Sequence, residues 1–459
     1  MIPPDWPRDS FFYHIYPLGF CGAPERNDLH SPPVPRLEKI WGWLDHLQRL
    51  GMNALYLGPL FESTTHGYDT ADYLRVDRRL GDNATLAALS AELHRRNIRL
   101  ILDGVFHHVG RDFWAFRDLI ERGQASGYRD WFDGVTFTAR SPWGDAFNYS
   151  CWEGHPELPK LNLRNPDVTA HLFEAVERWV REFDIDGLRL DVAYLLDERF
   201  LRELEGRCRS LKKDFWLLGE VIHGDYRRWL NGGLLDAVTN YECYKGLYSS
   251  HNDRNYFEIA FSLNRQFGDG GLYQGFPLYN FADNHDVDRV ASSLREPAHL
   301  YPLYCLLFTM PGVPSIYYGS EWGIPGAKTP GSDRALRPSL DLEKVARESR
   351  NRELARAIAR LARVRSASPA LRRGDYRQLF VGPEQLAFER RYEGETVIVA
   401  VNASAKTADL QVPAGASAGA PAASHLIDVL NDGKTYAAPG GRLRVDVPPG
   451  WARVLLGQL

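Results

Sequence analysis

The sequence lacks the features that place a protein at a membrane or on nucleic acid. No segment approaches the roughly 18 uninterrupted apolar residues of a membrane-spanning helix. Lys and Arg form no long run and the formal net charge is −4, so we expect neither nucleic acid nor a membrane as a partner. Residues 1–9 lack the charged-then-apolar pattern of a secretion signal, and we therefore expect a cytoplasmic protein.

Cysteine is also scarce. The five cysteines are odd in number, scattered and not arranged in any pairing motif, so we expect buried free thiols in a reducing compartment. Apolar residues, by contrast, are plentiful: 44% of the 459 residues are hydrophobic and 25% are charged. Such a chain can bury a large core and is too long for one simple domain.

Apolar, β-rich runs alternate with helix-sized segments over most of the chain. The predicted strands are residues 11–16, 54–58, 99–105, 187–192, 215–221, 237–241, 278–282 and 314–318. The stretches 36–50, 84–96, 167–183 and 345–364 carry apolar residues at helical spacing. Strands that alternate with helices predict parallel βαβ units, and eight of them predict a closed (β/α)8 TIM barrel in the α/β class.

Two segments depart from this alternation. Residues 107–164 are rich in turn residues and aromatics and are too long for an ordinary strand-to-helix loop, which predicts a small inserted domain after the third strand. After about residue 370 the apolar period changes to two, which predicts a C-terminal antiparallel β-sandwich. The expected domains are a barrel at 1–106 and 165–370, an inserted domain at 107–164 and the sandwich at 371–459.

Four short sequence blocks at the ends of predicted strands carry carboxylates, imidazoles or Arg. They are residues 103–108, 187–192, 218–221 and 281–286. Because the carboxyl ends of parallel barrel strands meet at one mouth, we expect these side chains to converge. Asp191 and Glu220 end neighbouring strands, so they can face each other across one sugar, as glycoside cleavage requires.

In their order and in their residues, the four blocks resemble the signature regions of the α-amylase family of glycoside hydrolases. The resemblance implies that Asp191 is the nucleophile of a retaining enzyme and that Glu220 is its general acid/base. It also implies that Asp286 holds the sugar hydroxyls and helps to distort the ring, and that His108 and His285 hydrogen-bond the same sugar.

Further residues take supporting roles in this resemblance. Arg189 lies two residues before Asp191 on the same strand face, where a fixed cation keeps the carboxylate ionised and oriented. Asp103 resembles the family carboxylate that braces this arginine, and Tyr68 resembles the tyrosine that stacks on the sugar. A purely structural ion pair of Asp103 with Arg189 stays open as an alternative, as does a packed loop position for Tyr68.

The inserted segment gives a finer resemblance. Residues 158–162 are similar to the neopullulanase and cyclomaltodextrinase group of the family. Among the aromatics of this segment, Trp143 and Trp152 are the ones we expect to reach the cleft, and most of the others to form a small core. The resemblance implies a small α-glucooligosaccharide substrate, short or cyclic, and specifically cyclic α-maltosyl-(1→6)-maltose cleaved to maltose. A cyclomaltodextrinase, a maltogenic amylase or an α-glucan transglycosylase are the alternatives, because hydrolysis and transfer share the covalent intermediate.

Two departures from the family pattern bear on cofactors and assembly. His107 stands where the family usually has an Asn that often binds calcium, and imidazole is a poor calcium ligand, so we expect no metal or other cofactor. The neopullulanase group also carries an N-terminal domain that helps to form its dimer. This chain enters its first strand at Phe11, so a homodimer would use another surface.

Two other classes of function compete with this hypothesis. A metal-dependent barrel hydrolase could be built on His107, His108, His285 and Asp286, but such barrels usually need a His-x-His on the first strand, where this chain has only His14. A catalytically inactive relative that serves a transporter would lack the carboxylates and carry a membrane span.

Overall fold

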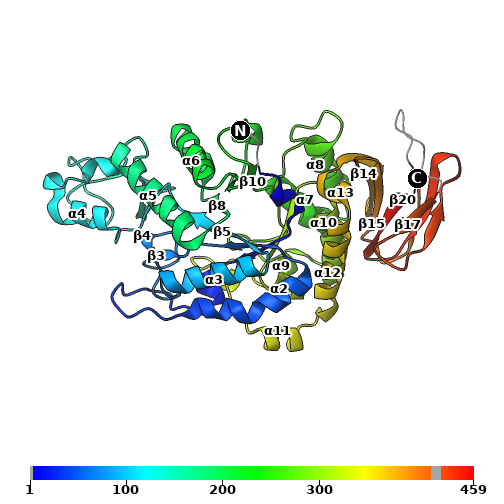
Figure 1. Ribbon diagram of the computed structural model, residues 1–459, viewed down its shortest axis with the longest axis horizontal. Coiled ribbons are helices and arrows are strands. Elements are labelled where there is room, and N and C mark those ends of the chain that lie inside the picture. Colours follow the sequence, from blue (N-terminus) through cyan, green and yellow to red (C-terminus); the bar gives the residue numbers. More distant parts are fainter. Residues whose placement is uncertain (1–3, 415–424, 459) are drawn as a thin grey trace.

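Eight parallel strands form the central sheet of the computed structural model, which describes residues 4–414 and 425–458 (Figure 1). In chain order they are β1 (Phe12–Ile15), β2 (Ala54–Leu57), β5 (Arg99–Gly104), β8 (Gly187–Leu190), β9 (Trp216–Gly219), β10 (Ala237–Val238), β11 (Tyr279–Asn280) and β12 (Val313–Tyr317). The sheet order is β10-β9-β8-β5-β2-β1-β12-β11, and a parallel bridge from Thr239 to Tyr279 joins its two edges. The predicted TIM barrel is confirmed.

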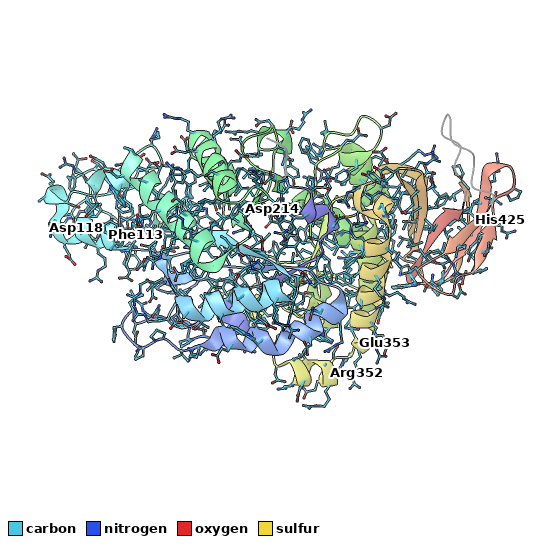
Figure 2. All side chains as sticks on the ribbon, viewed as in Figure 1. Phe113, Asp118, Asp214, Arg352, Glu353 and His425 are labelled. Carbon is cyan, nitrogen blue, oxygen red and sulfur yellow. The ribbon has the colours of Figure 1, made fainter. Side chains whose placement is uncertain are left out.

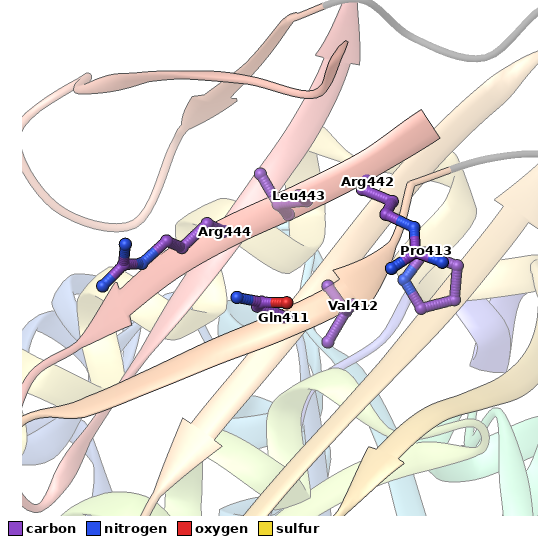
Figure 3. A pocket seen from close by; sticks show the side chains of 6 residues that line it. All are labelled: Gln411, Val412, Pro413, Arg442, Leu443 and Arg444. Carbon is purple, nitrogen blue, oxygen red and sulfur yellow. The ribbon is translucent and has the colours of Figure 1, made fainter. Parts of the chain in front are cut away.

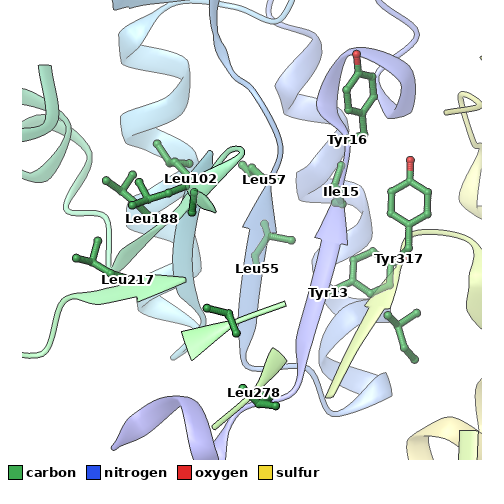
Figure 4. Packing of buried hydrophobic residues seen from close by; sticks show 14 of the residues in the cluster. Tyr13, Ile15, Tyr16, Leu55, Leu57, Leu102, Leu188, Leu217, Leu278 and Tyr317 are labelled. Carbon is green, nitrogen blue, oxygen red and sulfur yellow. The ribbon is translucent and has the colours of Figure 1, made fainter. Parts of the chain in front are cut away.

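Side chains alternate between the inside and the outside of the barrel, as the pleat of a strand requires. Phe12, Ile101 and Trp216 belong to a buried cluster that fills the interior. The residues between them, such as Leu55 and Leu102, belong to the large core shared with the surrounding helices (Figure 4). Two residues further along the same inside rows come His14 and Asp103, and the row of Trp216 and Leu218 reaches Glu220, so the apolar interior gives way to polar groups at the C-terminal mouth.

Helices cover the outside of the barrel (Figure 1). They are α1 (Pro17–Phe20), α2 (Leu44–Leu50), α3 (Asn83–Arg95), α5 (Pro166–Phe183), α6 (Glu198–Leu211), α7 (Tyr241–Asn252), α8 (Phe257–Phe267), α9 (Val290–Ser293), α10 (Leu300–Thr309), α11 (Leu342–Glu348), α12 (Arg352–Ala367) and α13 (Pro369–Arg373). Helix α5 shows how the sequence sets them. The Asn165 side chain caps its first turn by accepting a hydrogen bond from the Asp167 N–H, Pro166 occupies its first position, and Leu172, Val176 and Trp179 bury one face.

The helix predicted at 345–364 is instead two helices, α11 and α12. The chain leaves the helical conformation at Ser349, where ψ is 135°. The Ser349 hydroxyl donates to the Trp322 carbonyl at 3.0 Å and accepts from the Asn351 N–H at 2.9 Å. Serine side chains that bond nearby backbone in this way compete with the helix ladder, which is why the apolar spacing alone overestimated the helix.

The inserted segment projects from one end of the barrel between β5 and α5, on the left in Figure 1. It contains α4 (Trp114–Arg122) and the hairpin β6 (Cys151–Trp152) with β7 (His155–Pro159). Phe113 and Asp118 mark it in Figure 2. Most of its aromatics are buried against one another, as expected for a small core; these are Phe113, Phe116, Trp131, Phe132, Phe147 and Tyr149. A second hairpin, β3 (Phe61–Ser63) with β4 (Thr70–Val76), follows β2.

Antiparallel strands form the C-terminal part, on the right in Figure 1. Its larger sheet runs in the order β13 (Asp375–Val381), β14 (Gln385–Tyr392), β15 (Glu395–Asn402), β20 (Trp451–Gln458), β17 (His425–Asp428) and β18 (Thr435–Ala437). A ribbon of β16 (Ala408–Pro413) and β19 (Arg442–Val447) shares a core with this sheet through Ile398, Leu410 and Val445. The two layers confirm the predicted antiparallel sandwich. A hollow of about 500 Å³ lies on the ribbon and is lined by residues 411–413 and 442–444 (Figure 3).

Two buried arginines satisfy the end of α10, where the barrel meets the C-terminal sheets. Arg365, from α12, donates to the Phe308 carbonyl at 3.0 Å. Arg390, from β14, donates to the Thr309 carbonyl at 2.7 Å and to the Gly374 carbonyl at 2.8 Å. The last carbonyls of a helix have no partner within it, so guanidiniums from both sides satisfy the end of α10.

Two further features are the lengths of the apolar helices and the state of the cysteines. Among residues 4–414 and 425–458, no helix combines the length and the apolar character that crossing a membrane requires. The five cysteines are free thiols, and all are buried except Cys151, which is half-buried.

Candidate active site

Arg189 is the centre of a buried carboxylate cluster at the C-terminal ends of three adjacent strands, β5, β8 and β9. Its Nη1 donates to Asp103 Oδ1 at 2.8 Å and to Asp191 Oδ1 at 2.9 Å. Its Nη2 lies 2.8 Å from Glu220 Oε1. A planar guanidinium has donors in a fixed fork, so it sets the relative positions of the carboxylates it holds. Asp191 and Glu220 are therefore held as immediate neighbours.

A strained backbone residue fixes the second oxygen of Glu220. The Val192 N–H donates to Glu220 Oε2 at 3.0 Å. Val192 has a φ of +39°, in the left-handed region, which is rare for a β-branched residue. Such a conformation costs on the order of 1–3 kcal/mol and persists where the surrounding contacts impose it. Here the left-handed conformation turns the chain directly after Asp191, where the Val192 N–H faces Glu220.

Tyr241 provides a further contact to Glu220. Asn284 Nδ2 donates to the Tyr241 hydroxyl at 3.1 Å, and that hydroxyl lies 3.4 Å from Glu220 Oε1. With Asn284 donating to its oxygen, Tyr241 directs its own hydrogen toward Glu220. Beneath these groups the cavity has only about 20 Å³, room for one water, so the cluster is tightly packed from below.

A second group of polar side chains surrounds Asp286. His285 Nε2 lies 2.8 Å from Asp286 Oδ2, and Arg337 Nη2 donates to Asp286 Oδ1 at 3.0 Å. Arg337 Nε also donates to the His285 carbonyl at 3.0 Å. The Asp286 side chain is 35% exposed, far more than Asp103 or Glu220, because it faces the open mouth of the barrel.

Tyr68 links the two groups. Its hydroxyl donates to Asp103 Oδ2 at 3.0 Å and makes a short contact with His285 Nε2. Its ring stacks on His285 with centroids 5.5 Å apart, and Tyr16 stacks on the same imidazole at 5.7 Å. Asp103 also accepts a hydrogen bond from Tyr56 at 3.0 Å. Tyr68 is thus held by its hydroxyl within the polar site.

Burial and neighbouring charge shift the ionisation of these carboxylates in opposite directions. Burial raises the pKa of Asp191 well above its usual range, Arg189 opposes this, and the nearby carboxylate of Glu220 adds to it. For Asp286, burial also favours the neutral form, but His285 and Arg337 outweigh it and the pKa is lowered. Asp191 therefore depends on the Arg189 ion pair to be ionised, because both are buried together.

His107 and His108 follow β5 and are neutral at pH 7. Burial, and then His107, lower the pKa of His108 to about 3; burial, and then Lys160, lower the pKa of His107 to about 4. The Nδ1 atoms of the two rings lie 3.2 Å apart. His108 Nε2 is buried and has no hydrogen-bond partner among the residues that the structure describes, so it can bond a ligand hydroxyl.

The surroundings of His107 do not suit calcium. Calcium takes oxygen ligands, whereas this position offers an imidazole and the nearby cation of Lys160, which pairs with Asp133 at 2.8 Å. Within the described ranges, no three His, Cys, Asp or Glu side chains form a group that could hold a metal. The four residues of the metal-dependent alternative therefore do not assemble into such a group.

The two tryptophans expected at the cleft lie in different places. Trp152 is next to the cluster, with its ring 5.9 Å from His108 and 5.2 Å from His155. Trp143 is 59% exposed and packs over the Arg111 guanidinium at 5.1 Å. No contact between the described residues joins Trp143 to the cluster. The substrate role of Trp143 stays a prediction without that support.

Sequence reasoning missed Arg337, Tyr16 and Tyr241. Arg337 lies about a turn beyond Asp333, which it also contacts at 3.1 Å, in a loop after β12 with no strand pattern. Tyr16 and Tyr241 are the last residues of two predicted strands, so the rule that polar residues at strand ends face the mouth could have found them.

Comparisons with known proteins identify the family of this chain. The family model described as the alpha amylase catalytic domain matches residues 15–374. The chain belongs to the α-amylase family of glycoside hydrolases. A second model, the C-terminal domain of maltogenic amylase, matches residues 376–450. The resemblance drawn from the four sequence blocks is confirmed, and with it the class of the enzyme; the metal-dependent class is wrong.

Three similar members of the family have names. A cyclomaltodextrinase of Geobacillus thermopakistaniensis is 34% identical over 471 residues, which cover 97% of this chain and 76% of that protein. An intracellular maltogenic amylase of Bacillus subtilis is 30% identical over 388 residues, 80% of this chain and 63% of that protein. The solved structure of a ligand-free cyclic α-maltosyl-(1→6)-maltose hydrolase from Arthrobacter globiformis matches with a TM-score of 0.81 at 29% identity, covering 99% of this chain and 100% of that one. This glycoside hydrolase is thus similar to enzymes named for maltooligosaccharides and cyclodextrins.

Proposed function

We propose that this member of the α-amylase family is a cytoplasmic, retaining hydrolase of short or cyclic maltooligosaccharides. The observation that carries the mechanism is the Arg189 guanidinium, which contacts Asp191 at 2.9 Å and Glu220 at 2.8 Å. Two carboxyls on one guanidinium lie close together. Retaining glycosidases hold their two carboxyls about 5–5.5 Å apart, whereas inverting enzymes leave room for a water between them.

Asp191 and Glu220 then divide the work in two steps. In the first, Glu220 gives its proton to the glycosidic oxygen as Asp191 attacks the anomeric carbon, forming a glycosyl ester and releasing the leaving sugar. In the second, Glu220 takes a proton from water, whose oxygen attacks the same carbon and frees Asp191. Arg189 keeps the leaving carboxylate of Asp191 ionised, and the Val192 N–H orients Glu220 for both transfers.

The remaining polar groups hold the sugar at the cleavage site. The partly exposed carboxylate of Asp286 accepts bonds from sugar hydroxyls, and the neutral imidazole of His108 and the ring of His285 bond the same sugar. These bonds strengthen as positive charge develops on the ring, so they lower the barrier more than they tighten substrate binding. The rings of Tyr68 and Trp152 offer aromatic faces to the C–H surface of glucose.

The inserted segment supports a compact substrate. Glu153, at the tip of the β6–β7 hairpin, lies 3.5 Å from the Tyr194 hydroxyl, which follows β8. The hairpin thus reaches across the mouth to the barrel, which leaves less space for a long polymer at this end. The Tyr194 ring also packs on His223 at 5.6 Å, beside the exposed Ile222, where an aliphatic side chain gives a poor platform for an acceptor sugar. We therefore favour water over sugar as the second nucleophile.

Cyclic α-maltosyl-(1→6)-maltose is the specific substrate that we propose. The similarity to the Arthrobacter hydrolase extends over the full length of both chains, whereas the cyclomaltodextrinase extends beyond the matched region. A cyclomaltodextrinase or maltogenic amylase is the second candidate, favoured by the names and identities of the relatives. The name of the Bacillus subtilis relative supports a cytoplasmic location.

Product analysis tests this proposal. The purified enzyme is incubated with cyclic maltosyl-maltose, β-cyclodextrin, linear maltooligosaccharides and pullulan, and products are separated by chromatography while the first anomer released is followed by NMR. We expect α-anomeric maltose as the main product and the highest kcat/KM on the cyclic tetrasaccharide. Release of the β-anomer contradicts the retaining mechanism; a higher kcat/KM on cyclodextrin assigns the second candidate function.

A further inference from the structure

A groove lies along α12 and is lined by residues of the barrel and of the C-terminal sheets. Helix α12 stands between these two parts in Figure 1. The groove consists of two adjoining cavities of about 500 and 410 Å³. Both are lined by Arg360 and Arg363, so these two side chains mark where the cavities meet. None of the residues proposed for catalysis lines either cavity, and the groove is therefore separate from the active site.

The α12 face of the groove is strongly basic. Helix α12 contains five Arg and one Glu, although the whole chain has a net charge of −4. Arg356, Arg360 and Arg363 are spaced by four and three residues, so they lie on one face. Arg356 pairs with Glu353 at 2.7 Å, at the end of the helix marked in Figure 2. Arg360 and Arg363 have no carboxylate partner within residues 4–414 and 425–458.

Aromatic rings form the opposite wall of the larger cavity. Trp451, from β20, packs edge-on to Tyr301 with ring centroids 6.2 Å apart. Its indole N–H donates to Asn431 Oδ1 at 2.8 Å, which fixes the orientation of the ring. The Arg360 guanidinium lies 5.0 Å from the Trp451 ring centroid. The cation is thus held in place before a ligand arrives, which lowers the entropy lost on binding.

The smaller cavity adds an apolar floor but little further charge. Val364, Val397 and Leu456 line it beside the two arginines. Its one carboxylate, Glu395, already accepts hydrogen bonds from the Ser368 hydroxyl and, at 3.1 Å, from the Ala370 N–H. The groove thus holds three arginines, Arg356, Arg360 and Arg363, against the two carboxylates of Glu353 and Glu395, and neither carboxylate pairs with Arg360 or Arg363. Guanidiniums of this kind bind phosphate in a bidentate manner.

We propose that this groove is a binding site for a phosphorylated sugar. The phosphate binds at the junction of the cavities, between Arg360 and Arg363. The sugar ring lies in the larger cavity, with its C–H face against Trp451 or Tyr301 and its hydroxyls toward Glu353 and the Gly450 backbone. A volume of about 500 Å³ accommodates one hexose phosphate but not a folded polymer. The site does not depend on the proposed function of the catalytic cleft.

Calorimetric titration of the full-length protein tests this proposal. The probes are glucose 6-phosphate, inorganic phosphate and glucose, against wild type, Arg363→Ala, Arg363→Lys and the matched control Arg352→Ala, which changes an exposed arginine of the same helix outside both cavities. Because a hydrogen-bonded charge pair is lost, we expect Arg363→Ala to weaken glucose 6-phosphate binding about tenfold or more. Arg363→Lys should weaken it less, and Arg352→Ala should leave it unchanged.

The titrations with glucose and with inorganic phosphate test the sugar and the phosphate group of the ligand separately. Glucose should bind equally to wild type and Arg363→Ala, because it has no phosphate group for Arg363 to contact. Inorganic phosphate should bind several-fold more weakly than glucose 6-phosphate, because it lacks the sugar. No binding of glucose 6-phosphate, or equal binding to wild type and Arg363→Ala, overturns the site. Equal affinity for phosphate and glucose 6-phosphate reduces it to an anion site and overturns the sugar. Hydrolysis of maltotriose by Arg363→Ala at the wild-type rate shows that the variant is folded.

Discussion

Replacing Asp191 by Asn should abolish turnover and leave the protein at least as stable as wild type at pH 7. The amide keeps an oxygen for Arg189 Nη1 but cannot form the glycosyl ester, so we expect kcat to fall by at least about 10⁴-fold, the scale seen when a nucleophile is removed. The charge change is favourable. Asp103, Asp191, Glu220 and Asp286 are four carboxylates around the two guanidiniums of Arg189 and Arg337, and the variant removes one of them.

The size and the pH dependence of this effect follow from the raised pKa of Asp191. A carboxyl whose pKa is higher in the folded than in the unfolded protein holds its proton more tightly when folded, so it reduces stability as pH rises from about 4 through the folded value. Each unit of elevation corresponds to about 1.4 kcal/mol at pH values above both pKa values. The stability gained by Asp191→Asn should therefore be largest at pH 7 and above, and disappear near pH 4.

Chemical denaturation at pH 4.5 and pH 7.5 measures this difference, and reducing-end release from maltotriose measures activity. Asp77→Asn is the control, because Asp77 is also buried and has one ion pair, with Arg79 at 2.7 Å, outside the site; it accepts further hydrogen bonds from Ser63 and Asn27. Breaking that pair should cost about 3–5 kcal/mol. A similar loss of stability in Asp191→Asn at pH 7.5 would refute the reasoning about charge, and wild-type turnover by the folded variant would remove Asp191 from the role of nucleophile.

Three further predictions concern the same site. The acidic limb of kcat/KM should lie above the ordinary Asp range, because Asp191 acts ionised and its pKa is raised; a limb at or below about pH 4 contradicts this. Tyr241→Phe should lower kcat about tenfold with little change in KM, since it removes the hydroxyl 3.4 Å from Glu220. If the double variant Tyr241→Phe/Asn284→Ala loses no more kcat than Tyr241→Phe alone, the two residues act together; if the two losses add, they act independently. EDTA should leave activity unchanged, given His107 and Lys160 at the family calcium position, and recovery by calcium after loss would prove otherwise.

The sequence predicted the part of the site that is encoded locally. Arg189 lies in β8 and Asp191 directly follows that strand, and strand periodicity alone places them on the same face. Glu220 follows the next strand in the sheet, so barrel topology brings it to Arg189. Arg337 could not be found in this way, because it reaches Asp286 from an irregular loop whose path depends on the packing around it. Neither could Val192 be recognised as strained, since its conformation results from the contacts of its neighbours.

The fold shows the same division. The barrel follows from the alternation of strands and helices, but β10 and β11 have only two residues each, shorter than their apolar runs. The run of β10 is cut short because Tyr241 already begins α7. The expected single helix at 345–364 fails for a similar reason. One hydroxyl, that of Ser349, finds a tertiary acceptor at Trp322, which no spacing of apolar residues reveals.

The contacts that Arg365 and Arg390 make at the end of α10 bear on how the protein unfolds. Pulling the C-terminal sheets away would expose or strand Arg390 and the Thr309 carbonyl, and would loosen the carbonyls that Arg365 holds from the barrel side. Phe388 and Val399 of the sheet belong to the same buried hydrophobic cluster as the barrel, so separation would expose this shared core and we expect neither part to open first. The family boundary between residues 374 and 376 is therefore a boundary in sequence but not in cooperativity. We expect a single unfolding transition, in which the sheets protect the catalytic barrel although they contribute no residue to its site.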